Sequence, residues 1–326
     1  MFNNAINPHD LVIILEKVRQ GALGGALHRI FPVRRKDSRL WDRIVQPLKN
    51  WWDIPQVMER WNRLVSGDSS VDYLRYYTGK YLADRKGLAA LTVGCGSGHR
   101  ELEMEELGIF SRIDSIDISR ARVEYAKRLA ADSAKGRKIN YIVGDIFNIE
   151  LEEGGYDLVL AEQALHHLSP LDTAVRRIEK FLKPGGYLIF NEYVGPPRFQ
   201  WTNIQLGIVN AILALLPERF RRRWRSGTLK KREYRAGRLL MWLYDPTEAV
   251  ESRDIIPVLK SRFELLETRG YGGTILMILF RDIAQNFLST DSDTQRWLDF
   301  CFYMEDFFLE NGVIEHDFMT GVCRKT

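Results

Sequence analysis

Cysteine and long apolar runs are scarce in this chain of 326 residues. The three cysteines, Cys95, Cys301 and Cys323, have no CxxC spacing, which argues against a disulfide framework and a zinc site and favours a reducing compartment. The longest apolar stretch, 204–216, falls short of the about 20 residues that a membrane-spanning helix needs. The first ten residues are polar, unlike a secretory signal. We therefore expect a cytoplasmic protein without a transmembrane segment.

The chain has little net charge, but its charged residues are unevenly distributed along the sequence. The composition, 45% hydrophobic and 28% charged, is that of a folded protein, with a formal net charge of only +4. Residues 198–238 nevertheless hold 11 Lys or Arg and 2 Asp or Glu, whereas residues 282–317 hold 9 acidic residues and 1 basic residue. Two interpretations remain open: the two segments neutralise each other, or the basic one attracts an anionic partner.

The chain divides into three regions that differ in their predicted secondary structure. Residues 1–87 read as a helical N-terminal extension broken by glycine and proline, and they hold four of the eight tryptophans. We expect those tryptophans to pack the extension onto the rest of the protein. They are Trp41, Trp51, Trp52 and Trp61.

The middle region, 88–282, alternates strand-like and helix-like stretches. Such alternation predicts an α/β fold: a Rossmann-like, doubly wound, seven-stranded and mostly parallel sheet with helices on both faces. In such sheets ligands bind beyond the carboxyl ends of the strands. The expected strands are 88–93, 113–118, 139–143, 156–161, 187–190, 263–267 and 274–280.

Two further segments complete the expected organisation. A basic helical insertion at about 198–257 precedes the last two expected strands, over the ligand edge, where insertions act as lids or substrate collars. Residues 283–326 are expected to form an acidic C-terminal helical segment.

A glycine-rich loop carries the strongest local signal. It runs from Thr92 to Gly98 (TVGCGSG), directly after an expected strand and before an expected helix. Glycines permit the positive φ angles of a tight turn and let the backbone approach a ligand closely. A dinucleotide fingerprint would need glycine at its sixth position, where this chain has His99, so a nicotinamide oxidoreductase is disfavoured.

From this loop onward the sequence resembles the class I S-adenosylmethionine-dependent methyltransferases. Five motifs occur in the family's order across roughly a hundred residues. They are Gly94-x-Gly96-x-Gly98, Asp117 after the second strand, Gly144-Asp145-Ile146-Phe147 after the third, Tyr156 to Leu160 followed by Gln163 to Leu168, and the Leu182-Lys183-Pro184-Gly185-Gly186 turn.

The resemblance implies S-adenosyl-L-methionine as cofactor and S-adenosyl-L-homocysteine as product. Asp117 is expected to hold the ribose hydroxyls, and Asp145 and its neighbour the adenine. This chain has Thr92 where the family often has an acidic residue. The cofactor-binding residues implied are Gly94, Cys95, Gly96, Gly98, Asp117, Ile118, Asp145, Ile146 and Gln163.

An acceptor hydroxyl or amine must lose a proton as it is methylated, which calls for a nearby base. Histidine, glutamate and tyrosine side chains after the fourth and fifth strands are the candidates, and the sequence does not choose between the two histidines. The candidate catalytic residues are His166, His167, Glu192 and Tyr193. No ligand spacing in the sequence predicts a metal.

The acceptor itself is open. The segments 191–201, 245–250 and 271–274 resemble bacterial methyltransferases of surface-polysaccharide biosynthesis, and this resemblance favours a small-molecule or glycan acceptor. An RNA or lipid-linked acceptor and a non-catalytic cofactor-binding partner protein are alternatives, and no RNA-binding module supports nucleic acid. The apolar run before Arg219–Arg225 could contact an anionic membrane at its inner face or a phosphorylated substrate, or it could be a lid helix with a solvated basic tail.

Overall fold

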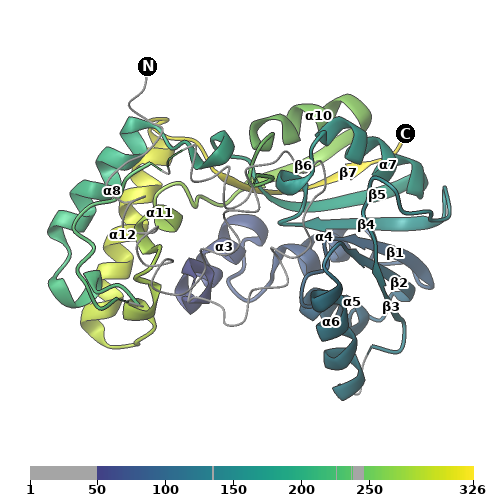
Figure 1. Ribbon diagram of the computed structural model, residues 1–326, viewed down its shortest axis with the longest axis horizontal. Helices are drawn as coiled ribbons and strands as arrows, with labels where there is room; N and C mark the ends of the chain where they lie inside the picture. The colour runs from purple at the N-terminus through teal and green to yellow at the C-terminus, as the bar shows by residue number, and fades with distance from the viewer. Residues whose placement is uncertain (1–49, 134–135, 225, 236, 238–245) are drawn as a thin grey trace, which may run out of the picture.

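A single seven-stranded sheet organises the protein (Figure 1). The computed structural model describes residues 50–133, 136–224, 226–235, 237 and 246–326. The strand order is β3-β2-β1-β4-β5-β7-β6, with β7 antiparallel to both of its neighbours and the other pairs parallel, which confirms the predicted fold class. The strands are β1 (Leu88–Val93), β2 (Phe110–Asp117), β3 (Ile139–Val143), β4 (Tyr156–Glu162), β5 (Leu182–Tyr193), β6 (Glu264–Gly270) and β7 (Phe318–Arg324).

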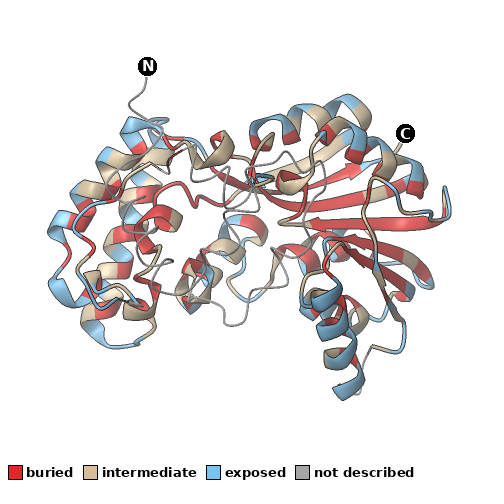
Figure 2. Ribbon diagram, in the orientation of Figure 1, coloured by how far each residue is buried: buried red, intermediate tan, exposed pale blue. Residues whose placement is uncertain are grey.

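Helices cover both faces of the sheet. One face packs against α7 (Leu171–Phe181) and α10 (Ile255–Arg262), and the other lies against α4 (Tyr73–Tyr81), α5 (His99–Glu106) and α6 (Arg120–Asp132) (Figure 1). The central strands β1 and β4 are mostly apolar and are buried along almost their whole length, because both faces of the sheet are covered (Figure 2).

Residues 274–280 do not form the expected strand. Leu276–Phe280 is a short helix, α11, and the carboxylate of Glu305 accepts hydrogen bonds from the backbone N–H groups of Ile275 (2.8 Å) and Leu276 (3.1 Å) at its start. Every residue from 275 to 280 is apolar, and such a run has no periodicity that distinguishes a strand from a buried helix. The strand prediction was therefore wrong here.

The seventh strand comes instead from residues 318–324, inside the acidic segment that we expected to be helical. That segment does contain a long helix, α12 (Ser292–Glu310), before β7. The sheet thus has two insertions, one before β6 and one between β6 and β7, rather than a single one. Helix α8 (Asn203–Leu215) from the first insertion and helices α11 and α12 from the second form a cluster at one end of the molecule, which we name the helical lobe (Figure 1).

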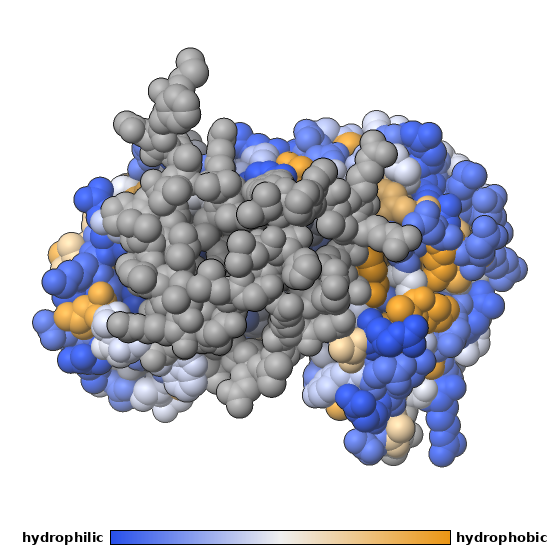
Figure 3. Space-filling view, viewed as in Figure 1, coloured by the Kyte–Doolittle hydropathy of each residue, from blue (hydrophilic) through white to orange (hydrophobic). Residues whose placement is uncertain are grey.

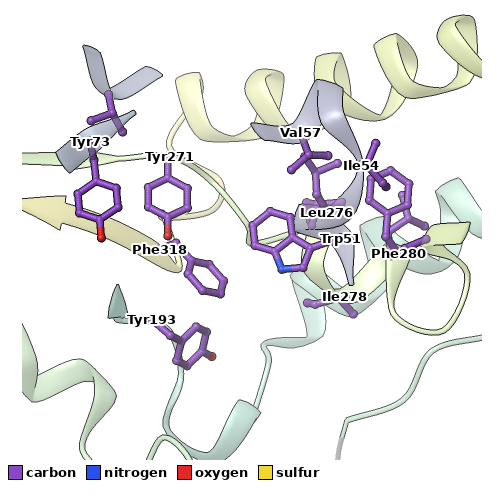
Figure 4. Packing of buried hydrophobic residues seen from close by; sticks show 14 of the residues in the cluster. Trp51, Ile54, Val57, Tyr73, Tyr193, Tyr271, Leu276, Ile278, Phe280 and Phe318 are labelled. Carbon is purple, nitrogen blue, oxygen red and sulfur yellow. The ribbon is translucent and has the colours of Figure 1, made fainter. Parts of the chain in front are cut away.

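The N-terminal extension joins this lobe to the sheet. Trp51, 3% exposed, lies among Val57, Leu276 and Ile278 (Figure 4), and its ring centroid is 4.4 Å from that of Trp61. Helix α3 (Pro55–Ser66) follows it. The predicted packing role is confirmed for Trp51 and Trp61, whereas Trp52 is 43% exposed and Trp41 lies outside the described residues.

The basic and acidic segments meet in the helical lobe. Arg223 pairs with Asp282 at 2.7 Å, and Arg219 pairs with Asp293. Of the two interpretations of the charge pattern, mutual neutralisation therefore holds for these arginines, while Arg225 lies outside the described residues. Hydrophilic residues dominate the described surface visible in Figure 3, with apolar residues in small groups. Within the described ranges, no helix has the length and apolarity needed to cross a membrane.

A buried carboxyl ties the lobe to the sheet and makes stability depend on pH. Asp317, 4% exposed, accepts a hydrogen bond from the Gln205 side chain of α8 (2.9 Å). Burial raises the pKa of Asp317 to about 7, with Glu305 and Glu315 acting in the same direction and Gln205 and Arg253 against it. The folded protein therefore keeps a proton that the unfolded chain releases near pH 4, so this group stabilises the fold at low pH and loses that contribution as pH rises to 7.

We expect Asp317→Asn to remove this part of the pH dependence, because the amide carries no charge at either pH. One pKa unit corresponds to about 1.4 kcal/mol, so the unfolding free energy of the variant relative to wild type should rise by about 2 to 3 kcal/mol between pH 5 and pH 8. Urea denaturation at both pH values measures this difference. A constant difference would show that Asp317 is ionised throughout.

Candidate active site

The glycine loop adopts the tight turn that its sequence predicts. Gly94, Gly96 and Gly98 have φ angles of 77°, 54° and 82°, in the left-handed region that favours glycine. A Cβ on Gly98 would lie 2.6 Å from the Ala126 Cβ, and one on Gly94 would lie 2.9 Å from the Ala164 Cβ. At Gly96, of the residues that the structure describes, a Cβ would meet only the Arg122 guanidinium, at 3.6 Å. Packing therefore requires the outer two glycines, whereas the middle one borders space that a ligand can enter.

Asp117 closes the same loop from the end of β2. One carboxylate oxygen accepts from the N–H of Gly96 (2.9 Å) and the other from the N–H of Ser119 (2.8 Å). The side chain is held beside the loop, and Ile118 next to it is half-buried. A fixed carboxylate can accept hydrogen bonds from ribose hydroxyls, and the open glycine backbone beside it leaves room for the amino-acid part of a nucleoside cofactor.

The other predicted cofactor residues lie at the same edge of the sheet. Asp145 follows β3 and accepts from the N–H of Phe147 (3.1 Å), while Ile146 is buried. Gln163 follows β4 with a φ of 49° and donates from its side chain to the Asn191 carbonyl (3.1 Å). Cys95 is half-buried within the glycine loop. The structure thus brings all of these positions to the carboxyl ends of neighbouring strands, and their contacts with a cofactor stay predictions.

An acidic group does lie beneath the loop, although the first strand lacks one. The hydroxyl of Thr92 donates to the carboxylate of Glu101 (2.7 Å), which is 1% exposed on α5. Burial raises the pKa of Glu101 to about 7, against the hydrogen bond from Thr92. Sequence reasoning missed this residue because only the turn of the loop brings α5 back beneath β1.

A second ionic cluster, also missed, fixes α5 to the end of β4. The guanidinium of Arg100 makes two hydrogen bonds of 2.8 Å to Glu162 and one of 3.0 Å to Asp72, the residue before α4. Two parallel N–H···O bonds hold a guanidinium and a carboxylate in a fixed plane. The N-terminal extension is thereby tied directly to the rim of the predicted cofactor site.

His166 and Glu192 form a buried pair after β4 and at the end of β5. The Glu192 carboxylate accepts from the N–H groups of Ala164 (2.8 Å) and Leu165 (2.7 Å) and lies 2.7 Å from Nδ1 of His166. Glu192 is fully buried, and burial raises its pKa to about 8 although the backbone donors act in the opposite direction. A carboxylate at Nδ1 orients the imidazole and leaves Nε2 for chemistry.

Glu248 approaches the other side of this histidine pair. Its carboxylate lies 3.7 Å from Nε2 of His166 and 3.9 Å from Nδ1 of His167. Glu248 belongs to the 198–257 insertion, in the segment 245–250 whose resemblance pointed to no site role for it. The insertion brings this carboxylate to the two histidines.

The Tyr193 ring borders this site, with its centroid 6.4 Å from that of His166, but its hydroxyl is bonded elsewhere. The hydroxyl donates to the Pro196 carbonyl (2.9 Å), and the ring, 1% exposed, packs edge-on against Phe199 and against Phe318 (Figure 4). Burial raises the pKa of Tyr193 well above its usual value. A hydroxyl so buried and so bonded supports a packing role instead of the predicted catalytic one.

Comparison with known proteins finds a family model that matches the middle region of the chain. Residues 91–190 match the family model described as a methyltransferase domain. Among curated proteins, the demethylmenaquinone methyltransferase of Lactococcus lactis is 29% identical over 126 residues, which is 38% of this chain and 50% of that protein. The malonyl-[acyl-carrier protein] O-methyltransferase of Priestia megaterium is 27% identical over 106 residues, 32% of this chain and 37% of that protein.

The matches to these relatives span half or less of each one's length. Among solved structures, a geranyl diphosphate methyltransferase in complex with GPP and sinefungin has a TM-score of 0.49 at 12% identity, covering 89% of this chain and 98% of that one. An S-adenosylmethionine-dependent methyltransferase from Mesorhizobium loti has a TM-score of 0.44 at 16% identity, covering 77% and 97%. Residues 91–190 of this chain, which hold the glycine loop and the strand-end carboxylates, are thus similar to a methyltransferase domain.

Proposed function

We propose that the protein transfers the methyl group of S-adenosylmethionine to an oxygen or nitrogen atom of a small-molecule acceptor. One observation carries this proposal: a single residue, Ala164, lies between the glycine loop and the His166–Glu192 pair and contacts both. Ala164, whose N–H binds Glu192, packs against Gly94, and the strands β2, β1, β4 and β5 that end there are neighbours in the sheet. The predicted cofactor site and a candidate base therefore share one edge.

The bound cofactor supplies a methyl group already activated by its positive sulfur. The protein's part is then to align the acceptor and to remove its proton. Glu192 holds Nδ1 of His166, so that Nε2 faces the acceptor side and takes the proton. Arg100 and Glu162 fix the rim, and the insertion carrying Glu248 borders the acceptor side.

The class of acceptor is part of the proposal. A glycan acceptor in surface-polysaccharide biosynthesis rests on the sequence resemblance alone. The curated relatives are named for methylating demethylmenaquinone and a malonyl-carrier protein, which keeps lipid-linked and carrier-linked acceptors in view. With Arg219 and Arg223 paired to acidic side chains, contact with an anionic membrane gains no support from the described residues.

Formation of S-adenosylhomocysteine over a panel of glycan, lipid-linked, amine and RNA acceptors tests the proposal. Product formation that depends on one hydroxyl or amine acceptor is expected. Tight binding of S-adenosylmethionine without turnover on any acceptor would instead favour a non-catalytic cofactor-binding protein, and tighter binding of NAD than of S-adenosylmethionine would overturn the assignment.

We expect Gly96→Ala to weaken binding of S-adenosylhomocysteine about 10- to 100-fold, the effect of placing a methyl group in a packed contact. Among the described residues its Cβ would meet only Arg122, so we expect the loss to come from the ligand side. Isothermal titration calorimetry measures the affinity.

Gly108→Ala is the matched control. Gly108 also has a positive φ, 70°, so the backbone strain is similar, and a Cβ added there would meet none of the described residues within 4 Å. It precedes β2, at the edge of the sheet opposite the candidate site. Equal affinities for both variants would show that the loop does not bind the cofactor.

A further inference from the structure

The two histidines and Glu248 form a ligand set that the sequence did not predict. One ring nitrogen from each histidine and one Glu248 oxygen all lie within 4.8 Å of one another. These residues come from η4 (Leu165–His167) after β4 and from the insertion that precedes α10, two segments that meet only in the folded protein.

We infer that His166, His167 and Glu248 bind a divalent transition-metal ion, with Zn²⁺ or Co²⁺ as the chemical class. Two imidazoles and one carboxylate are a ligand set for such ions, with metal–ligand distances of about 2.0 to 2.2 Å. Ligand atoms around a tetrahedral ion of this size lie roughly 3.4 Å apart. One Glu248 oxygen lies 3.7 Å from Nε2 of His166, and the other lies 3.9 Å from Nδ1 of His167. One ligand atom from each of the three residues lies within 4.8 Å of the others, so binding an ion requires them to approach by up to about 1.4 Å.

The surroundings of this set are those of a metal centre. Glu192 lies 2.7 Å from Nδ1 of His166, so the nitrogen turned toward Glu248 is Nε2, and a carboxylate at the second ring nitrogen is the usual support of a metal-binding histidine. His167 and Glu248 are each 19% exposed, which leaves a route for an ion. Three protein ligands also leave a coordination position open.

Metal binding has a consequence for turnover, and this part rests on the proposed function. The nitrogen that would bind the ion, Nε2 of His166, is the one assigned to take the acceptor's proton. An imidazole cannot bind a metal and accept a proton at the same nitrogen. Zn²⁺ should therefore inhibit methyl transfer, and chelation should restore it.

Co²⁺ titration of the full chain without a histidine tag tests the site. We expect visible absorption bands that saturate at one ion per chain, and one Zn²⁺ per chain by elemental analysis after dialysis. Glu248→Gln should remove the bands, and Glu192→Gln, which keeps an oxygen for the backbone donors, should weaken binding about 10- to 100-fold. Glu218→Gln, an exposed acid of the same insertion, should bind as wild type does.

Absence of saturable bands, or bands that survive Glu248→Gln, would overturn the metal site and leave the proposed function intact. One-to-one binding with undiminished methyl transfer would do the reverse: the metal site would stand, and the role of His166 as the base would be wrong.

Discussion

Replacing His166 by asparagine should lower kcat for methyl transfer about 100- to 10,000-fold, the contribution that a positioned general base makes to a rate. Asparagine can still donate a hydrogen bond to Glu192, so the three hydrogen bonds that Glu192 accepts from backbone N–H groups should remain. The asparagine amide cannot take up a proton at neutral pH. Single-turnover conversion of S-adenosylmethionine, with an acceptor found by the panel, measures the chemical step.

His167→Asn is the comparison that separates the two histidines. Glu192 contacts the ring of His166 and not that of His167, so we expect His167→Asn to reduce kcat less than tenfold. Both variants should bind S-adenosylhomocysteine as tightly as wild type. Equal losses for the two, or a full rate for His166→Asn, would remove His166 from the role of base.

Lys230→Met should destabilise the fold by about 3 to 5 kcal/mol, the cost of breaking a buried ion pair from one side. The Lys230 ammonium is fully buried in the helical lobe, where it pairs with Glu233 (2.8 Å) and donates to the carbonyls of Ile278, Leu279 and Arg281 at 2.8 to 3.0 Å. It therefore satisfies the carbonyls at the end of α11. Methionine has a similar shape and provides none of these bonds.

The neighbouring exposed lysine gives the control. Lys231→Met should change the unfolding free energy by no more than about 0.5 kcal/mol, as exposed substitutions usually do. Adding Glu233→Gln to Lys230→Met should not recover the loss, because Glu233 also pairs with Arg281 and the amide would give up that ion pair. Denaturation with urea at pH 7 measures all three. A cost below 1 kcal/mol for Lys230→Met would mean that the ammonium is solvated.

The sequence predicted the parts of the site that are contiguous with their strands. The glycine loop follows β1 directly and Asp117 ends β2, so a local pattern of apolar run, glycines and helix formers was sufficient to locate them. The pairing of His166 with Glu192 was not predicted, but both residues were candidates because each follows a strand of the same sheet.

The remaining features depend on contacts between distant segments. Glu101 accepts a hydrogen bond from Thr92 only because the glycine loop folds α5 back onto β1. Glu248 approaches the histidines from an insertion. Helix α11 was taken for a strand because the six apolar residues 275–280 show no periodicity, and Glu305 on another helix binds the backbone at the start of α11. None of these three relations leaves a pattern in a single stretch of sequence.

The place of β7 constrains the order in which the protein assembles. β6 is the edge strand and β7 lies between it and β5, yet residues 271–317, with α11 and α12, separate β6 from β7 in the chain. During synthesis β6 leaves the ribosome before its partner exists, and closing so long a loop slows the pairing of strands. Strand β6 carries the charged residues Glu264, Glu267 and Arg269. Charges on an edge strand oppose its pairing with another chain, and we expect this protection to matter before β7 is synthesised.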